Sequence, residues 1–193
     1  MDSRPPEPGA TRSRYSGGAI AFHWAIALLI VANIAVALVT DDWHGPARSA
    51  AMQFHKATGI TVLVLSIGRL VWRLAHRPPP FPAGIRPWEA VAARSVHWLF
   101  YALMVVMPLS GWAMVSAPVE RKPLLWYGFF DLPYLPVQGN KALGGFAHET
   151  HEVLGYAMIA LIVLHVAAAL KHHFFDQSRL IARMWPGRVA ASR

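Results

Sequence analysis

Residues 153–170 of the chain read VLGYAMIALIVLHVAAAL, an apolar run whose one strongly polar side chain is His165. A helix needs about 20 predominantly apolar residues to cross the hydrocarbon of a bilayer. Three further runs of this character cover about residues 19–39, 57–74 and 96–116. The sequence therefore predicts an all-α integral membrane protein, a four-transmembrane-helix bundle whose helices run up, down, up and down.

The composition agrees with a membrane location. Of the 193 residues, 55% are hydrophobic and 15% are charged, against about 25% charged in an average soluble domain. The chain has no cysteine, which excludes disulfides and thiolate-ligated cofactors. We expect one membrane domain over residues 19–176, between a polar, disordered tail at residues 1–18 and a basic tail at residues 177–193.

Basic residues gather on one side of the predicted bundle. Thirteen of the 18 Lys and Arg residues fall in the two tails, in the connection between the second and third helices, and beside these segments. The positive-inside rule then puts both termini, and hence both tails, in the cytoplasm. Membrane orientation accounts for the net charge of +8, so no nucleic-acid partner is expected. The aromatic connection at 117–145 is expected to cap the other face.

Four histidines, His23, His55, His151 and His165, lie within or at the ends of these runs. A polar ring in hydrocarbon is costly and usually functional, although a single one is equally explained as a packed ring bonded to a carbonyl. His151 and His165 are 14 residues apart, which leaves them about 40° apart on one helix face with about 21 Å of rise between them. Alternating helix directions match His23 in depth with His165, and His55 with His151.

Each matched pair predicts two axial ligands for one iron, so the four histidines predict two haem groups at two depths. Without cysteine the haems are expected to be non-covalent haem b, and bis-histidine iron suits electron transfer. Gly59 and Gly155 each follow a predicted ligand by four residues and share its helix face. A flat macrocycle fits against such a glycine, and the alternative is helix–helix packing by small residues.

Four more residues are candidates for binding the cofactors. Arg69 and Arg14 are candidates for haem propionates, and Arg69 also for a charge at a quinone site; the alternative is orientation-setting charge that snorkels to the headgroups. His97 is a candidate for a quinone hydrogen bond or a proton relay, or is an interfacial histidine. His172, seven residues after His165, is a candidate propionate partner.

The motifs extend along nearly the whole chain, and the set reads Arg14-Tyr15-Ser16, His23-Trp24, His55-x-x-x-Gly59, Arg69-Leu70-x-x-Arg73-Leu74, His97-Trp98, Pro108-Leu109-x-Gly111-Trp112, His151-Glu152, His165-x-x-x-Ala169-Leu170-x-His172-His173 and Arg183-Met184. Together they resemble the bacterial cytochrome b561 family of four-helix dihaem membrane proteins. The resemblance implies that His23 pairs with His165 and His55 with His151. His148 also precedes a glutamate, but its 17-residue spacing to His165 rotates the two rings about 100° apart, which favours His151.

The resemblance also implies a function. It is that of a dihaem b-type electron carrier in the bacterial inner membrane, which moves electrons between an outer-surface donor and a ubiquinone-type quinone. Some family members are superoxide oxidases, which makes superoxide:quinone oxidoreductase one expected activity. Two alternatives stay open: a haem-bearing anchor subunit that docks a hydrogenase or dehydrogenase, and a non-haem metal or proton transporter. No motif indicates the physiological donor or the oligomeric state.

Overall fold

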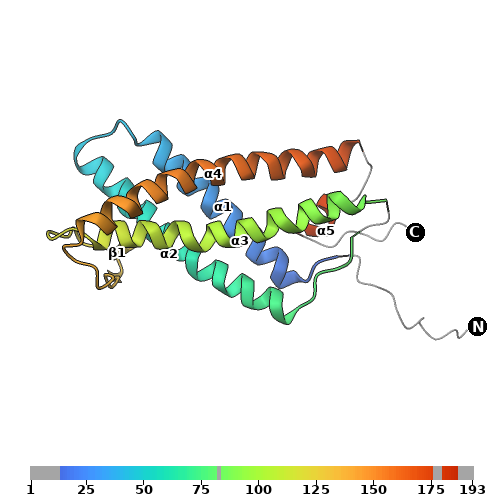
Figure 1. Ribbon diagram of the computed structural model, residues 1–193, viewed down its shortest axis with the longest axis horizontal. Coiled ribbons are helices and arrows are strands. Elements are labelled where there is room, and N and C mark those ends of the chain that lie inside the picture. Colours follow the sequence, from blue (N-terminus) through green and yellow to red (C-terminus); the bar gives the residue numbers. More distant parts are fainter. Residues whose placement is uncertain (1–13, 82–83, 176–179, 187–193) are drawn as a thin grey trace, which may run out of the picture.

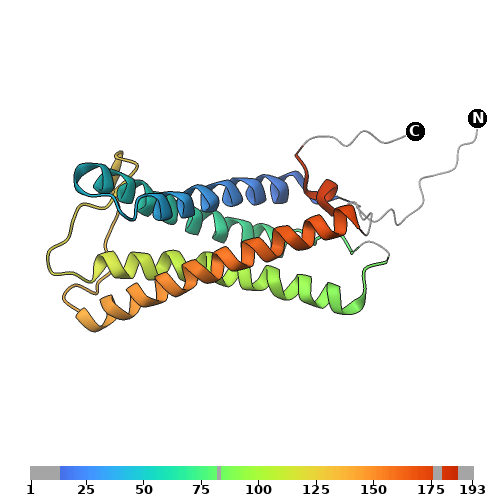
Figure 2. The same cartoon turned by 90° about the horizontal axis from the view of Figure 1, so that it is seen from above.

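The computed structural model describes residues 14–81, 84–175 and 180–186. Its four long helices are α1 (Gly17–Val39), α2 (Gly45–Ala75), α3 (Pro87–Ser116) and α4 (Lys141–Phe174) (Figure 1). All four are long and apolar enough to cross a membrane, which confirms the predicted all-α membrane bundle. Consecutive helices are antiparallel, so α1 begins at the end of the bundle where α4 finishes (Figure 2). We call this the inner end and the opposite one the outer end.

The bundle is a chain of neighbouring helices, in which α1 packs on α2, α2 on α3, and α3 on α4. Its interior holds an apolar cluster that includes Ile26, Val62 and Met158. Large apolar side chains such as Val64 and Val163 are left exposed on the outside. Lipid tails are as apolar as these side chains, so an exterior of this kind is suited to hydrocarbon rather than water.

Three helices begin well before the apolar runs that predict them. The second run starts near residue 57 but α2 begins at Gly45, where Pro46 occupies the first turn. The third starts near residue 96 but α3 begins at Pro87, and the fourth starts near residue 153 but α4 begins at Lys141. Proline is well suited to a first helical turn, and the Asn140 side chain accepts a hydrogen bond from the backbone N–H of Leu143, 3.0 Å away. Hydropathy marks only the most apolar stretch of each helix, whereas Pro46 and the capping residue Asn140 mark where α2 and α4 begin.

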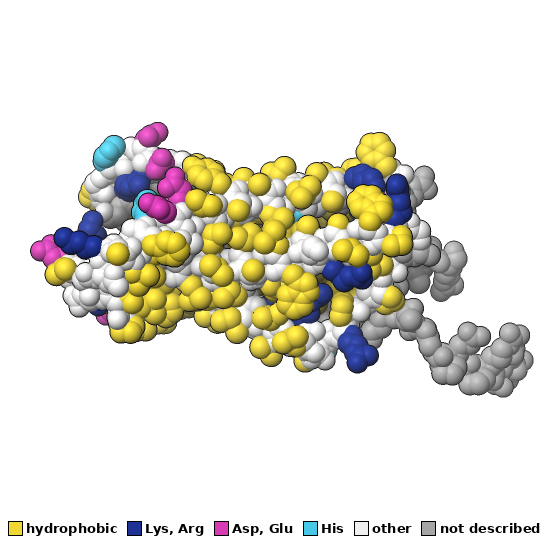
Figure 3. Space-filling view, viewed as in Figure 1, with side chains coloured by type: hydrophobic (Ala, Val, Ile, Leu, Met, Phe, Trp, Pro, Cys, Tyr) yellow, Lys and Arg dark blue, Asp and Glu magenta, His cyan; other side chains and the backbone are white. Residues whose placement is uncertain are grey.

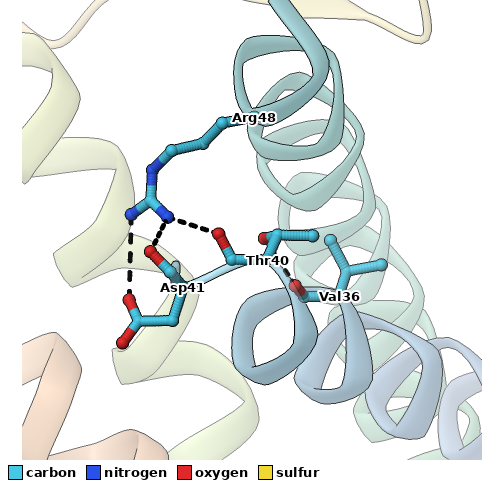
Figure 4. A network of polar contacts seen from close by, with 4 residues as sticks. All are labelled: Val36, Thr40, Asp41 and Arg48. Atoms are coloured by element: carbon cyan, nitrogen blue, oxygen red, sulfur yellow. Dashed lines mark hydrogen bonds and ion pairs between the residues drawn. The ribbon is translucent and has the colours of Figure 1, made fainter. Parts of the chain in front are cut away.

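The short connection between α1 and α2 is fixed by Arg48 (Figure 4). Its guanidinium donates to the backbone carbonyls of Thr40 and Asp41, and its Nη2 lies 3.8 Å from Asp41 Oδ1. The Thr40 hydroxyl donates to the carbonyl of Val36 at 2.7 Å. The last carbonyls of a helix have no partner within the helix, so these bonds satisfy the end of α1 and hold it against α2.

The long connection between α3 and α4 lies against the outer end of α2. It contains a two-stranded antiparallel ladder of β1 (Leu125–Trp126) and β2 (Phe130–Asp131). Trp126 Nε1 donates to Thr61 Oγ1 at 3.0 Å, and Tyr127 Oη lies 3.0 Å from Thr58 Oγ1. The aromatic connection thus covers this end of the bundle, as its composition predicts.

The two predicted tails lie mostly outside the described residues. Of residues 1–18 the structure describes 14–18, and α1 already begins at Gly17; of residues 177–193 it describes 180–186, which contain the short helix α5 (Leu180–Met184). Tyr15 N–H donates to the carbonyl of Arg183 at 3.3 Å, so the described parts of both tails meet at the inner end. On the face shown in Figure 3, Asp and Glu side chains gather at the outer end.

Candidate functional site

Two of the predicted histidines meet near the outer end of the bundle. The rings of His55 on α2 and His151 on α4 have their centres 6.1 Å apart and are inclined at 77°. An imidazole nitrogen lies about 2.0–2.1 Å from a metal such as zinc and the ring centre about 1.1 Å behind it, so two rings on opposite sides of one metal have centres about 6.3 Å apart. The pair therefore has a spacing that would allow both rings to hold one metal.

Both outer rings are oriented by main-chain carbonyls. The Nδ1 atom of His55 lies 3.2 Å from the carbonyl oxygen of Asn33, and that of His151 lies 2.9 Å from the carbonyl oxygen of Met107. Histidines that bind metals commonly donate their second N–H to a carbonyl in this way, which fixes the tautomer and the ring direction. With Nδ1 used as a donor, Nε2 of each ring remains for the metal.

The His151 ring packs against α3, just after Pro108, the proline within that helix. The Ser110 hydroxyl donates to the carbonyl of Met107 at 2.7 Å and lies 3.3 Å from His151 Nδ1. At Gly111 an added Cβ atom would lie 2.9 Å from Cε1 of the His151 ring. The stretch from Pro108 to Gly111 therefore supports the ligand, a role that its place in the sequence motif alone does not reveal.

The second pair lies toward the inner end. The rings of His23 on α1 and His165 on α4 have their centres 6.4 Å apart, at an angle of 62°, again close to the trans-ligand spacing. The Nδ1 atom of His23 is buried without a hydrogen-bond partner among the described residues. Buried polar atoms are nearly always partnered, so this atom marks a place where a further group fits.

The inner pair has different neighbours from the outer one. On α3, the His97 ring lies 5.9 Å from that of His165 and the Phe100 ring lies 5.4 Å from it, both measured between centres. Three histidines from three helices thus converge at this level. Within the described ranges, however, no three His, Asp or Glu side chains are placed to hold a bare metal ion.

Space for a flat group is present beside both predicted glycines. A Cβ atom added at Gly59 or at Gly155 would meet no atom within 4 Å. A packing glycine looks different, as Gly68 shows, where an added Cβ would lie 3.3 Å from the ring of Phe22. The space beside Gly59 and Gly155 is thus free of packed side chains, as it also is at Gly145.

An apolar layer separates the two histidine levels. Met158 lies midway between His151 and His165 along α4 and is 1% exposed, and Ile26 of α1 is buried in the same cluster. The two pairs are about 21 Å apart along the helix. Such an arrangement suits two separate binding sites rather than one shared site.

The other candidates are distributed unevenly around these pairs. The guanidinium of Arg69 lies 5.7 Å from the ring centre of Tyr101, and Arg14 donates to the carbonyl of Trp185; both line a cavity at the inner end. His172 is partly buried near the end of α4. His148 is exposed, which agrees with the choice of His151 as the outer-level histidine.

Four membrane-crossing helices with histidine pairs at two levels are the features of a membrane b-type cytochrome. Residues 14–187 match the model of the family described as prokaryotic cytochrome b561, and the chain belongs to this family. With its four membrane-crossing helices, the protein is a multi-pass bacterial membrane protein. Membership of the family implies that it binds b-type haem and carries electrons through it.

Several curated relatives are similar over almost their full length. Cytochrome b561 homolog 2 of Escherichia coli is 32% identical over 177 residues, which cover 90% of this chain and 92% of that protein. Cytochrome b561 homolog 1 of the same organism is 31% identical, over 91% of this chain and 99% of that protein. The probable superoxide oxidase CybB of Yersinia pestis is 27% identical, over 90% of this chain and 96% of that protein.

Proposed function

We propose that this protein is a dihaem electron carrier that transfers electrons between a donor at the outer surface and a ubiquinone-type quinone in the bilayer. His55 and His151 hold one haem b, and His23 and His165 hold the other. The observation that carries the proposal is the spacing of the rings, 6.1 Å in one pair and 6.4 Å in the other, since both are close to the value for two ligands of one iron. Bound haem supplies one-electron redox chemistry, and the chain supplies ligation, burial and charge.

The chain is oriented in the bacterial inner membrane with its inner end toward the cytoplasm. This orientation follows from the excess of Lys and Arg in the segments at that end. It places His23 and His165 near the cytoplasmic surface, with Arg69, Arg14 and His172 as partners for haem propionates.

In the same proposal, Gly59 and Gly155 provide the open faces against which the outer macrocycle lies. His97 provides a hydrogen bond or a proton to quinone near the inner haem. Its ring lies 5.9 Å from that of His165, close enough to touch a quinone bound at the edge of that site.

Superoxide is the proposed outer donor. The supporting observations are the similarity to a probable superoxide oxidase and the basic residues near the outer pair. Lys56 directly follows His55 on α2, and Arg121 and Lys122 lie in the connection over the same end. Although Asp and Glu side chains also gather at this end (Figure 3), a local group of cations attracts an anion such as superoxide and raises the rate at which it arrives.

Stopped-flow reduction of the purified protein by superoxide, with and without added quinone, tests the proposal. We expect haem absorption bands that reduce with superoxide and reoxidise faster when quinone is present. A chain that holds haem but reacts with neither substrate would be the anchor subunit of a partner oxidoreductase. A colourless chain that stays colourless when supplied with haem would be a transporter, and the proposal would be wrong.

A further inference from the structure

A cavity of about 440 Å³ lies at the inner end of the bundle, between the start of α1, the end of α2 and the body of α3. Its lining includes four arginines and three Trp or Tyr residues, namely Arg14, Arg69, Arg73, Arg77, Tyr15, Trp72 and Tyr101. We call it the arginine cavity. Its size is within the range of pockets that bind small ligands or headgroups, about 300–1,000 Å³.

The positive charge of the arginine cavity is not balanced by carboxylates. Among the described residues, its lining contains no Asp or Glu. Glu89, the acidic residue described at this end of the bundle, is engaged elsewhere: its Oε1 lies 3.1 Å from Lys171 Nζ, and its Oε2 accepts from the backbone N–H of Arg86 at 3.1 Å. Gathering cations without counter-charge is unfavourable, so the cavity is suited to an anion.

Three of the four guanidinium groups, those of Arg14, Arg69 and Arg73, are held in place before any ligand arrives. Arg69 and Arg73 lie on successive turns of α2, and the guanidinium of each is 5.7 Å from the ring centre of Tyr101. Arg14 donates to the carbonyl of Trp185, while its Nε is buried with no hydrogen-bond partner in the described part of the chain. Donors fixed in this way bind an oxyanion with less loss of side-chain freedom.

One wall of the cavity is an aromatic stack at the end of α2. The indole Nε1 of Trp72 donates to the hydroxyl of Ser16 at 3.0 Å. The ring of His76 stacks on Trp72 with centres 4.1 Å apart and an interplanar angle of 6°. Beside the cavity, the ring centre of Trp98 on α3 lies 6.0 Å from the guanidinium of Arg73, and Trp98 is 53% exposed. The anion site is therefore flanked by apolar surface that would lie against acyl chains.

We propose that the arginine cavity binds the phosphate of an anionic phospholipid, with the acyl chains lying against Trp98. Guanidinium groups bind phosphate oxygens through paired, charge-assisted hydrogen bonds. Basic pockets between transmembrane helices at the cytoplasmic side are suited to anionic headgroups. A soluble phosphate has the same oxygens, but it gains nothing from the apolar flank. Arg73 and Arg77 contact the headgroup, whereas the more deeply placed Arg69 stays available to a haem propionate.

Native mass spectrometry of the purified, haem-loaded protein in neutral detergent tests this site. Phosphatidylglycerol and phosphatidylcholine with identical acyl chains are titrated separately, and phosphatidylglycerol should bind at lower concentration. Arg73→Gln and Arg77→Gln should each weaken its binding about tenfold, the effect of losing one charge-assisted contact. Arg94→Gln is the matched control, because Arg94 is an exposed arginine at the same end whose guanidinium lies over Phe81, 5.6 Å from the ring centre.

Four results would overturn the assignment. They are equal binding of the two lipids, an equal loss in Arg94→Gln, displacement of phosphatidylglycerol by inorganic phosphate at the same concentration, and loss of a haem in Arg73→Gln. The last would show that the arginines serve a propionate instead. Since Arg77 is exposed at the cavity mouth, Arg77→Gln tests the lipid contact even if Arg73→Gln does not fold.

Discussion

The Nδ1 atom of His151 on α4 lies 2.9 Å from the main-chain carbonyl oxygen of Met107 on α3. This bond fixes the ring that faces His55. None of the four paired histidines, however, lies on α3. The same helix presents His97 and Phe100 to His165 at the inner level. We infer that α3 determines the orientation of the two histidine rings of α4. Substitutions that disturb the packing of α3 are therefore expected to weaken haem binding.

The first prediction concerns Gly111. In Gly111→Ala the new methyl group would lie 2.9 Å from Cε1 of His151, so the ring must leave its present position opposite His55. Overpacking of this kind costs about 1–3 kcal/mol, and we expect the outer haem to be partly lost while the inner one remains. Haem content per chain and the redox titration of the visible spectrum measure this.

Gly145→Ala is the matched control for that change, because a Cβ atom there meets nothing within 4 Å. It should keep both haems and gain slightly in helix stability, by up to about 1 kcal/mol. Normal binding of both haems in Gly111→Ala would show that the His151 ring is not confined by α3.

The second prediction concerns the pairing of ligands. His55→Ala should remove the outer haem and leave the inner one, whereas His165→Ala should do the reverse, because each variant leaves only one axial ligand at one level. Pyridine haemochrome assays then give one haem per chain in place of two. His148→Ala, a change at an exposed ring, should retain both. Two haems in each of the ligand variants would contradict the proposed pairs.

The third prediction concerns the open space at Gly155. Nothing lies within 4 Å of a Cβ atom built there, so Gly155→Leu should fold with unchanged helix content but exclude the outer macrocycle. Circular dichroism and haem content distinguish the two effects. Gly145→Leu serves as the control with the same side chain on the same helix. If Gly155→Leu bound both haems normally, the space beside this residue would not be the haem site.

The fourth prediction concerns His97. As a quinone or proton contact it is not an iron ligand, so His97→Ala should keep both haems and their reduction by superoxide. Reoxidation by quinone should slow about 100-fold, the lower range for loss of an acid–base group. His173→Ala, at an exposed position on the last turn of α4, should react at the normal rate. If both variants were reoxidised by quinone equally slowly, His97 would have no specific role in quinone reduction.

Periodicity and hydropathy predict the parts of this protein that depend on side chains alone. The four helices follow from apolar runs, and the choice of His151 over His148 follows from the 14-residue spacing to His165 and the geometry of a continuous helix. The carbonyls of Asn33 and Met107 are not predictable in this way, since every residue has one and only the packing selects these two. The early start of α4 at Lys141 escapes hydropathy because its first turns lie outside the apolar run.

The Met158 layer and the two histidines beside it belong to one uninterrupted helix, α4. Any tilt or rotation of α4 therefore displaces a ligand at both levels in concert, and the two redox potentials are expected to covary. Independent adjustment of one centre is left to α1 for the inner level and to α2 for the outer, so substitutions that separate the two potentials are expected on those helices.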